Sequence, residues 1–290
     1  MTTSHLPTGK LTMTSKLKMN DGHSIYRFGF GVYEAVGQEC KQSVKWALEA
    51  GYRLIDSAEW YENEAETGSA IREFMEESST PREEIHVTTK LMANSTYDHA
   101  LKSIKLSLKK LGLDYIDTYL IHGPYPDQAA RLASWKACEE GVRLGLVKSI
   151  GVSNYGERHL VELEKAGSKT VPCLNQIDLH PFMTRVELVK YCQDHNIIAE
   201  AWGPLARGMK FSDPTVSEIA KAHNKTTAQV MLRWGLQRGH VVIPKSVSQA
   251  RIIANAQIFD FELSNDEVEQ LTALDCYLVT DWDPIKDPSV

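Results

Sequence analysis

Four residues whose side chains could move a proton follow apolar stretches in the first half of the 290-residue chain. Asp56 ends the stretch YRLID, Lys90 ends HVTTK, His122 ends YIDTYLIH, and Tyr61 comes shortly after Asp56. A carboxylate, an ammonium, an imidazole and a phenol in one site could protonate a developing alkoxide. Each residue alone has an ordinary explanation, such as a turn former, an exposed lysine or a packed histidine. Their recurrence at successive strand ends favours a catalytic group.

The expected chemistry is acid catalysis by Tyr61. A tyrosine in water has a pKa of about 10 and is a slow proton donor at neutral pH. Burial raises the pKa of a phenol, whereas a nearby ammonium lowers it. We therefore expect Lys90 to lower the pKa of Tyr61 and Asp56 to hold Lys90 charged. A neutral His122 would donate a hydrogen bond to the substrate oxygen.

A second polar cluster, late in the chain, is typical of a phosphate site. Lys245, Ser246 and Arg251 lie where an expected strand passes into a helix, in a chain whose formal net charge is −6. An arginine can pair bidentately with a phosphate, and a helix N-terminus stabilises an anion. A solvated surface is the alternative explanation for two neighbouring cations.

Strands and helices alternate along the chain and would bring these residues together. Short, almost continuously apolar stretches are expected to be strands buried on both faces, separated by amphipathic helices. The expected strands lie at 52–56, 86–90, 115–122, 149–152, 173–178, 197–202 and 241–244. The expected helices lie at 39–50, 65–77, 97–111, 129–144, 157–166, 185–195, 216–223, 227–238, 249–257 and 265–274.

This alternation, without a break in composition, predicts an α/β fold: a (β/α)8 TIM barrel with an N-terminal β-hairpin and extra C-terminal helices. We expect one domain over residues 16–290, after a loosely ordered lead at 1–15, with the hairpin turning at Asn20-Asp21-Gly22. The carboxyl ends of the barrel strands would then form the active site. A doubly wound nucleotide-binding fold is the alternative. However, Gly29-Phe30-Gly31 lacks the third glycine of its fingerprint, and we interpret this segment as a tight turn near the first strand.

Composition indicates an ordinary globular protein, with 42% apolar and 24% charged residues. The negative net charge argues against nucleic acid or an anionic membrane surface as the main partner. No stretch approaches the roughly 20 apolar residues of a membrane span, and no secretory signal is visible. Five widely spaced cysteines without a C-x-x-C pair suit reduced thiols. We expect a cytoplasmic monomer or weak homodimer that acts on a small molecule.

Three motifs resemble those of the aldo-keto reductase family. The segment GYRLIDSAEWYENE, at 51–64, is similar to the signature around the family's catalytic Asp and Tyr. The segment YLIHGP, at 119–124, resembles the one that bears the catalytic His, and IPKS, at 243–246, resembles the signature near the adenine phosphate. The resemblance extends from Met19 to Leu274. It implies NADPH-dependent reduction of an aldehyde or ketone to an alcohol by the four residues named first, with Tyr61 as the proton donor.

The resemblance also implies which residues hold the cofactor and the substrate. Lys245, Ser246 and Arg251 would bind the 2′-phosphate of NADPH, which favours NADPH over NADH. The other cofactor residues would be Ser153, Asn154, Gln176, Trp202, Gly203, Leu205 and Asn255. The substrate would contact His122 and three aromatic walls, Tyr33, Trp60 and Tyr125, which suit an apolar or aromatic carbonyl. No metal is expected.

Four positions depart from the family's pattern. Ala254 stands where many relatives carry Glu or Gln toward the adenine, so we expect weaker cofactor binding. Val32 replaces a usual Thr, and Gly203 replaces a common Ser. Gly123 stands where many relatives carry Trp, so we expect a roomier pocket on that side. Trp202 occupies the place of an aromatic, usually Tyr, that stacks on the nicotinamide.

Other functions stay open. A cofactor-binding regulatory subunit of the same fold, with slow turnover, could keep all four catalytic residues. A metal-dependent barrel hydrolase has less support, because His180 and His195 lie far apart and form no H-x-H or H-E-x-x-H motif. The tail from Asp275 to Val290, which contains Trp282, could close over the pocket or trail away from it.

Overall fold

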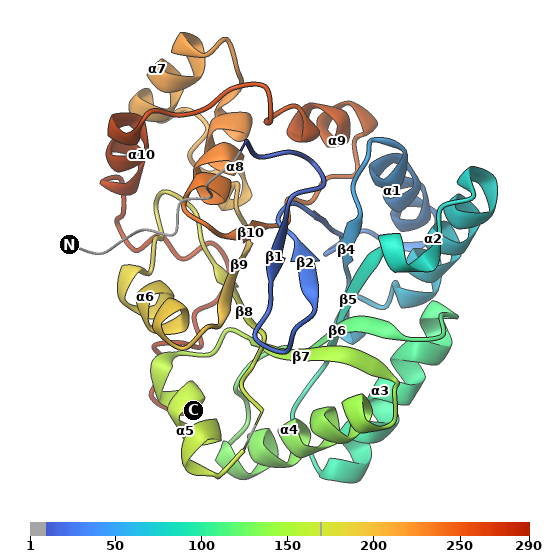
Figure 1. Ribbon diagram of the computed structural model, residues 1–290. Helices are drawn as coiled ribbons and strands as arrows, with labels where there is room; N and C mark the ends of the chain where they lie inside the picture. The colour runs from blue at the N-terminus through green and yellow to red at the C-terminus, as the bar shows by residue number, and fades with distance from the viewer. Residues whose placement is uncertain (1–9, 169) are drawn as a thin grey trace.

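The computed structural model describes residues 10–168 and 170–290, and a parallel barrel forms its centre (Figure 1). Eight strands follow one another in chain order, each paired in parallel with the next. They are β3 (Phe30–Gly31), β4 (Leu54–Asp56), β5 (His86–Leu91), β6 (Ile116–Ile121), β7 (Val147–Ser153), β8 (Leu174–Asp178), β9 (Ile198–Trp202) and β10 (Val241–Val242). The predicted α/β barrel is confirmed.

The barrel closes where β3 meets β10. A parallel bridge joins Gly31 to Lys245, and the N–H of Gly29 donates to the carbonyl of Val242 at 2.9 Å. Gly29 has no room for a side chain, because a Cβ there would lie 2.5 Å from the side chain of Leu54. The prediction of a tight turn at this glycine pair is therefore wrong, since the segment is the first barrel strand.

Helices cover the outside of the barrel between the strands (Figure 1). They are α1 (Gly37–Glu49), α2 (Glu64–Ser78), α3 (Tyr97–Leu111), α4 (Gln128–Arg143), α5 (Glu157–Lys165), α6 (Val186–Asp194), α7 (Pro214–Ala222), α8 (Thr227–Gln237), α9 (Gln249–Ala256) and α10 (Asn265–Thr272). Each expected helix is present, with ends that shift by a residue or two. For example, α7 begins early because the Asp213 side chain caps it and Pro214 suits its first turn. No helix in the described part of the chain is both long and apolar enough to traverse a bilayer.

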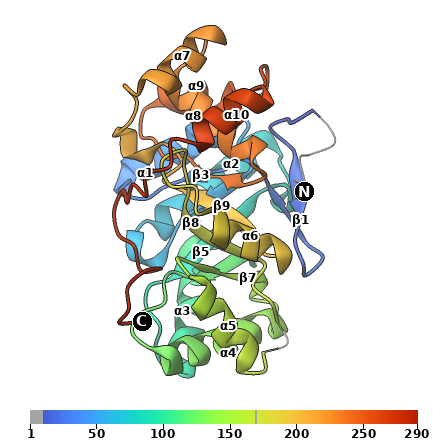
Figure 2. The ribbon, with the colours of Figure 1, turned by 90° about the vertical axis from the view of Figure 1, so that its left-hand side faces the viewer.

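An antiparallel hairpin, β1 (Lys16–Lys18) and β2 (Ser24–Tyr26), packs on the barrel interior. Its Met19 and Ile25 are buried with interior strand residues such as Leu54 and Val241. Figure 2 shows the hairpin on the opposite side of the barrel from the segment that follows α10. Residues 1–9 of the expected lead lie outside the described residues, whereas Leu11 is buried in the core. The division of the chain at residue 16 stays a prediction.

Candidate active site

The four residues that sequence analysis put forward as catalytic meet at the carboxyl ends of β4, β5 and β6. Nζ of Lys90 lies 2.6 Å from Oδ1 of Asp56 and 3.3 Å from the hydroxyl of Tyr61. That hydroxyl lies 3.5 Å from Nε2 of His122. The fold therefore brings an acid, a cation, a phenol and an imidazole within hydrogen-bond reach of one another.

Local structure explains this convergence. Asp56 and Lys90 lie on neighbouring parallel strands, where every second side chain points into the barrel. Tyr61 ends a 3-10 turn, Glu59–Tyr61, that Glu62 closes with a left-handed φ of 53°. The turn returns the phenol to the strand ends, so that Nζ of Lys90 lies 4.8 Å from the Tyr61 ring centroid.

The Lys90–Asp56 ion pair is buried, with relative exposures of 0% and 2%. Burial raises the pKa of Asp56, and Lys90 and Gln176 oppose that effect. Burial also acts to lower the pKa of Lys90, but Asp56 and Tyr61 outweigh it and raise that pKa above its ordinary value. Nζ donates a further hydrogen bond to the carbonyl of Ser57 at 2.8 Å. All three protons of the ammonium therefore have an acceptor.

The phenol and the imidazole are both neutral near pH 7. Burial raises the pKa of Tyr61 to about 12, although Lys90 lowers it. Lys90 thus acts in the expected direction, but burial has the larger effect. Burial and then Lys90 hold the pKa of His122 well below its ordinary value. The site presents a phenol O–H and an uncharged imidazole side by side.

The residues expected near the nicotinamide continue the site along β7, β8 and β9. Nε2 of Gln176 donates to Oδ2 of Asp56 at 2.8 Å. Asn154 donates through Nδ2 to the His122 carbonyl at 3.0 Å and accepts at Oδ1 from the Trp202 indole N–H at 2.8 Å. Ser153 completes the row through a hydrogen bond to the Gln176 carbonyl at 2.8 Å. These side chains and the four candidate catalytic residues thus form one network.

The residues expected to hold the phosphate lie together where β10 leads into α9. Nε of Arg251 donates to Oγ of Ser246 at 3.2 Å, and the N–H of Ser248 donates to the same oxygen at 3.1 Å. Within residues 10–168 and 170–290, neither Lys245 nor Arg251 forms an ion pair with a carboxylate. Two such cations at the start of a helix fit an anionic phosphate group.

Three further positions assigned to the cofactor lie in the segment after β9 and on α9. Gly203 has a φ of 66°, and a Cβ there would lie 2.9 Å from Oδ1 of Asp178. The positive φ and this contact both favour glycine at position 203. Leu205 precedes the 3-10 turn Ala206–Gly208 and packs against the core, and Asn255 is buried on α9.

Exposed aromatic residues surround the Tyr61–His122 pair. The ring centroids of Tyr33 and Tyr61 lie 5.1 Å apart, and those of Trp60 and His122 lie 6.0 Å apart. Tyr33 is 41% exposed and Trp60 is 59% exposed. Large apolar groups left open to solvent beside a polar site are available to bind an apolar ligand.

Trp282 closes the side of the pocket that Gly123 was expected to open. A Cβ on Gly123 would lie 3.0 Å from the Trp282 indole. The indole also stacks on Tyr125, with 5.8 Å between centroids and 20° between planes. The prediction of a roomier pocket at this point is wrong, because an indole reaches it from the C-terminal segment. In the sequence, the only signal for this contact is the presence of a tryptophan in the C-terminal segment. The aromatic residues at the mouth, together called the rim below, are Tyr33, Trp60, Tyr125 and Trp282.

The C-terminal segment lies along the mouth of the barrel (Figure 2). A side-chain oxygen of Asp283 lies 2.9 Å from the Arg185 guanidinium. The Tyr125 hydroxyl donates to Oδ2 of Asp287 at 2.5 Å. These contacts tie the segment to the loops that follow β6 and β8, so it does not trail away from the pocket.

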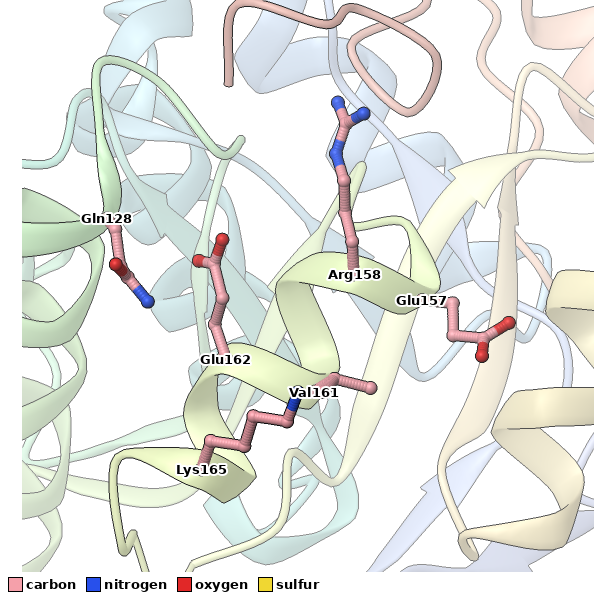
Figure 3. Close-up of a pocket in the computed structure, with 6 residues that line it drawn as sticks. All are labelled: Gln128, Glu157, Arg158, Val161, Glu162 and Lys165. Carbon is pink, nitrogen blue, oxygen red and sulfur yellow. The ribbon is translucent and has the colours of Figure 1, made fainter.

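A separate cavity of about 460 Å³ lies outside the barrel, where α4 and α5 approach each other (Figure 3). Its lining residues are Gln128, Glu157, Arg158, Val161, Glu162 and Lys165. None of them is among the residues that the sequence analysis singled out, and their charges are of both signs. None of these lining residues belongs to the site described above.

Comparison with known proteins gives a consistent result. A family model described as "Aldo/keto reductase family" matches residues 29–276. An uncharacterized oxidoreductase of Schizosaccharomyces pombe is 45% identical over 274 residues, which cover 94% of this chain and 98% of the relative. The glyoxal reductase of Bacillus subtilis is 41% identical, with 91% and 94% covered. The crystal structure of a Bombyx mori aldo-keto reductase in complex with NADP is 34% identical, with a TM-score of 0.87 and 93% and 96% covered.

Proposed function

The chain belongs to the aldo/keto reductase family of oxidoreductases, and we propose that it reduces an aldehyde or ketone to an alcohol with NADPH. The observation that carries this proposal is the position of the Tyr61 hydroxyl, between the Lys90 ammonium at 3.3 Å and His122 at 3.5 Å. Such a group can protonate an oxygen that gains charge. The glyoxal reductase among the relatives and the NADP complex among the solved structures support the proposal.

Tyr61 is the proposed proton donor. Its pKa of about 12 keeps the hydroxyl protonated until the substrate oxygen becomes an alkoxide, which is a much stronger base. Lys90 already donates to the phenol oxygen and stabilises the phenolate that remains after proton transfer. When bound, NADPH supplies the hydride. Asp56 holds Lys90 in place and charged.

His122 is proposed to orient the substrate carbonyl. Its Nε2 faces Tyr61, and its Nδ1 has no hydrogen-bond partner in the described part of the chain. We assign the imidazole proton to Nε2, which then donates to the substrate oxygen beside the Tyr61 hydroxyl. Because this imidazole is neutral, it stabilises negative charge on the oxygen and does not compete with Tyr61 as an acid.

The cofactor is proposed to lie across the mouth from β7 to α9. Ser153, Asn154 and Gln176 would hold the carboxamide. Trp202, whose indole N–H donates to Oδ1 of Asn154, would stack on the nicotinamide. Gly203, Leu205 and Asn255 would line the path to the phosphates. Lys245, Ser246 and Arg251 would bind the 2′-phosphate, because two cations without a carboxylate partner stabilise a dianion.

The proposed substrate is a small apolar or aromatic carbonyl compound. Tyr33, Trp60 and Tyr125 supply apolar walls, and the Trp282 indole limits the space beside Gly123. Aromatic walls around a few polar groups favour ligands with one carbonyl group on an apolar body.

Reductase activity is tested by following NADPH absorbance with a panel of aromatic and aliphatic aldehydes. We expect turnover with the wild-type chain and a fall of about 10²–10⁴-fold in kcat for Tyr61→Phe, with NADPH binding retained. Tight NADPH binding without turnover of any carbonyl would instead support a cofactor-binding regulatory subunit.

The cofactor assignment is tested by measuring the dissociation constants of NADPH and NADH. Lys245→Ala and Arg251→Ala should each weaken NADPH binding and leave NADH binding nearly unchanged. Lys109→Ala, which removes an exposed cation on α3, is the matched control. The ratio of the NADH to the NADPH dissociation constant measures the preference for NADPH. If this ratio is the same in Lys245→Ala and Arg251→Ala as in Lys109→Ala, the phosphate site lies elsewhere.

A further inference from the structure

The carboxyl group of Glu200 lies in the barrel interior and has no role in the mechanism above. It is on β9 and is completely buried. Neither of its oxygens has a hydrogen-bond partner in the described residues. A buried carboxylate without such partners is strongly disfavoured. The group must therefore be neutral or be compensated by its surroundings.

The polar neighbours of Glu200 belong to the catalytic network. Strand pairing sets Glu200 opposite Gln176 on β8, and Gln176 donates to Asp56 at 2.8 Å. The charges of Asp56 and Lys90 both act on the Glu200 carboxyl. These four residues, called the floor below, are Asp56, Lys90, Gln176 and Glu200.

Two further neighbours of Glu200 in the described part of the chain, Val241 and Cys173, offer no compensating charge. On the β10 side, the residue in register with Glu200 is the apolar Val241. Cys173, just before β8, is a titratable group on which the charge of Glu200 acts. Burial, more than Asp21 or Glu200, raises the pKa of its thiol well above the ordinary value. A neutral thiol cannot balance a carboxylate.

The floor thus contains two carboxyl groups and one ammonium. Lys90 lies 2.6 Å from Asp56 and is paired with it. An ionised Glu200 would add an unbalanced negative charge to a region without solvent. Burial and then the charge of Asp56 raise the pKa of Glu200 to about 8, with Lys90 and Gln176 opposing them. Glu200 therefore keeps its proton at neutral pH, and the floor carries no net charge.

We propose that neutral Glu200 is a positioning residue that acts through Gln176. While Glu200 holds its proton, the Gln176 amide stays hydrogen-bonded to Asp56. The same side chain is then in place to contact the nicotinamide carboxamide. When Glu200 ionises, its carboxylate competes with Asp56 for the Gln176 N–H and adds negative charge near Lys90. The Lys90–Tyr61 arrangement is then disturbed, and Tyr61 becomes a weaker acid. The inference rests on the proposed reductase function.

The first test compares the pH profiles of kcat and KM for the wild-type chain and Glu200→Gln. Glutamine has nearly the same shape and cannot ionise, so folding should be preserved. We expect wild-type kcat to fall severalfold as the pH rises through about 8, with a smaller change in carbonyl KM. Glu200→Gln cannot ionise and should lack this fall. An alkaline fall at the same pH in both proteins would overturn the positioning role.

The second test needs no turnover. Between the ordinary glutamate pKa of about 4.3 and the folded-state pKa of about 8, only the folded chain keeps the Glu200 proton. Stability from this group is therefore complete below about pH 4.3 and is lost as the pH rises toward 8. Glu200→Gln should gain several degrees in Tm relative to wild type as the pH rises from 5 to 8. Glu218→Gln, on exposed α7 surface, is the control and should show no such gain.

The two tests separate failure of this inference from failure of the proposed function. If the Tm difference between Glu200→Gln and wild type does not vary with pH, Glu200 does not hold a proton in the folded chain. Turnover in the wild-type chain with an unchanged Glu200→Gln profile overturns only the role of Glu200. A wild-type chain that turns over no carbonyl overturns the proposed function and, with it, the positioning role.

Discussion

The floor and the rim of the same pocket are built in opposite ways. The floor residues lie on barrel strands and are almost completely buried, and Asp56 contacts both Lys90 and Gln176 through charged or amide groups. The rim residues lie on loops and on the C-terminal segment, where Tyr33 and Trp60 remain largely exposed. Rim contacts are mainly between aromatic rings.

This difference assigns the proposed catalysis to the floor and the choice of substrate to the rim. Charges in a region of low dielectric interact strongly, so small changes in the floor have large effects on folding and on proton transfer. Loops at the barrel mouth can change without altering the strands that carry the catalytic groups. We therefore expect floor substitutions to affect stability and turnover, and rim substitutions to affect which substrate is used.

The largest effect is expected from Asp56→Asn in the floor. The substitution leaves the buried Lys90 ammonium without its carboxylate, which should lower the free energy of unfolding by about 3–5 kcal/mol. Urea denaturation measures the change. Glu77→Gln removes the carboxylate partner of Lys45, where Glu77 is 58% exposed, and should cost far less because solvent screens the pair. Equal losses in the two variants would contradict the contrast between buried and exposed pairs.

A second buried titratable group in the barrel, His86, should also affect the pH dependence of stability. Nε2 of His86 lies 2.9 Å from the Thr118 hydroxyl, and burial lowers the His86 pKa to about 4. Below about pH 6.5 only the unfolded chain takes up this proton, so stability falls as the pH drops from 6.5 to 4. The total loss from His86 is on the order of 3 kcal/mol.

Glutamine in place of His86 can still hydrogen-bond to Thr118 but cannot titrate. His86→Gln should therefore flatten the dependence of the unfolding free energy on pH between 6.5 and 4. His99→Gln, at an exposed position on α3, is the control and should follow the wild type. If the unfolding free energy of His86→Gln falls as steeply between pH 6.5 and 4 as that of wild type, His86 is not the group responsible.

In the rim, Trp282→Ala should change selectivity more than stability. Removing the indole opens the space beside Gly123 and leaves the four catalytic residues in place. We expect the ratio of kcat/KM for bulky over small aromatic aldehydes to rise about tenfold. Val279→Ala, at an exposed position on the same segment, should leave the ratio unchanged. If this kcat/KM ratio is unchanged in Trp282→Ala, Trp282 does not form a wall of the substrate pocket.

The smallest effect is expected from Arg207→Gln at the mouth. Arg207 pairs with Glu34 at 3.1 Å and Asp281 at 3.2 Å, and all three side chains are about a third exposed or more. Exposed pairs of this kind contribute less than about 1 kcal/mol and are screened by salt. The cost of Arg207→Gln in unfolding experiments should vanish in about 1 M NaCl, whereas that of Asp56→Asn should persist. A salt-insensitive loss for Arg207→Gln would contradict this distinction.

Local patterns are sufficient to predict the barrel and the meeting of Asp56, Lys90 and His122 at its strand ends. Buried parallel strands are continuous apolar stretches, so the positions of Asp56, Lys90 and His122 at their ends could be read from the sequence. Parallel pairing then brings neighbouring strand ends together. Gly29 was misinterpreted because a glycine required by the close approach of Leu54 looks the same in sequence as a glycine required by a turn.

The sequence alone determined the fold class, the family resemblance and the types of group available for proton transfer, because these depend on residue type and short spacing. Only the tertiary structure decided the shape of the pocket and the charge state of its floor. Trp282 fills the space beside Gly123 from a distant part of the chain. The state of Glu200 depends on burial and on Asp56, Lys90 and Gln176, which come from three other strands. Such effects depend on distances in space, which no local pattern in the sequence contains.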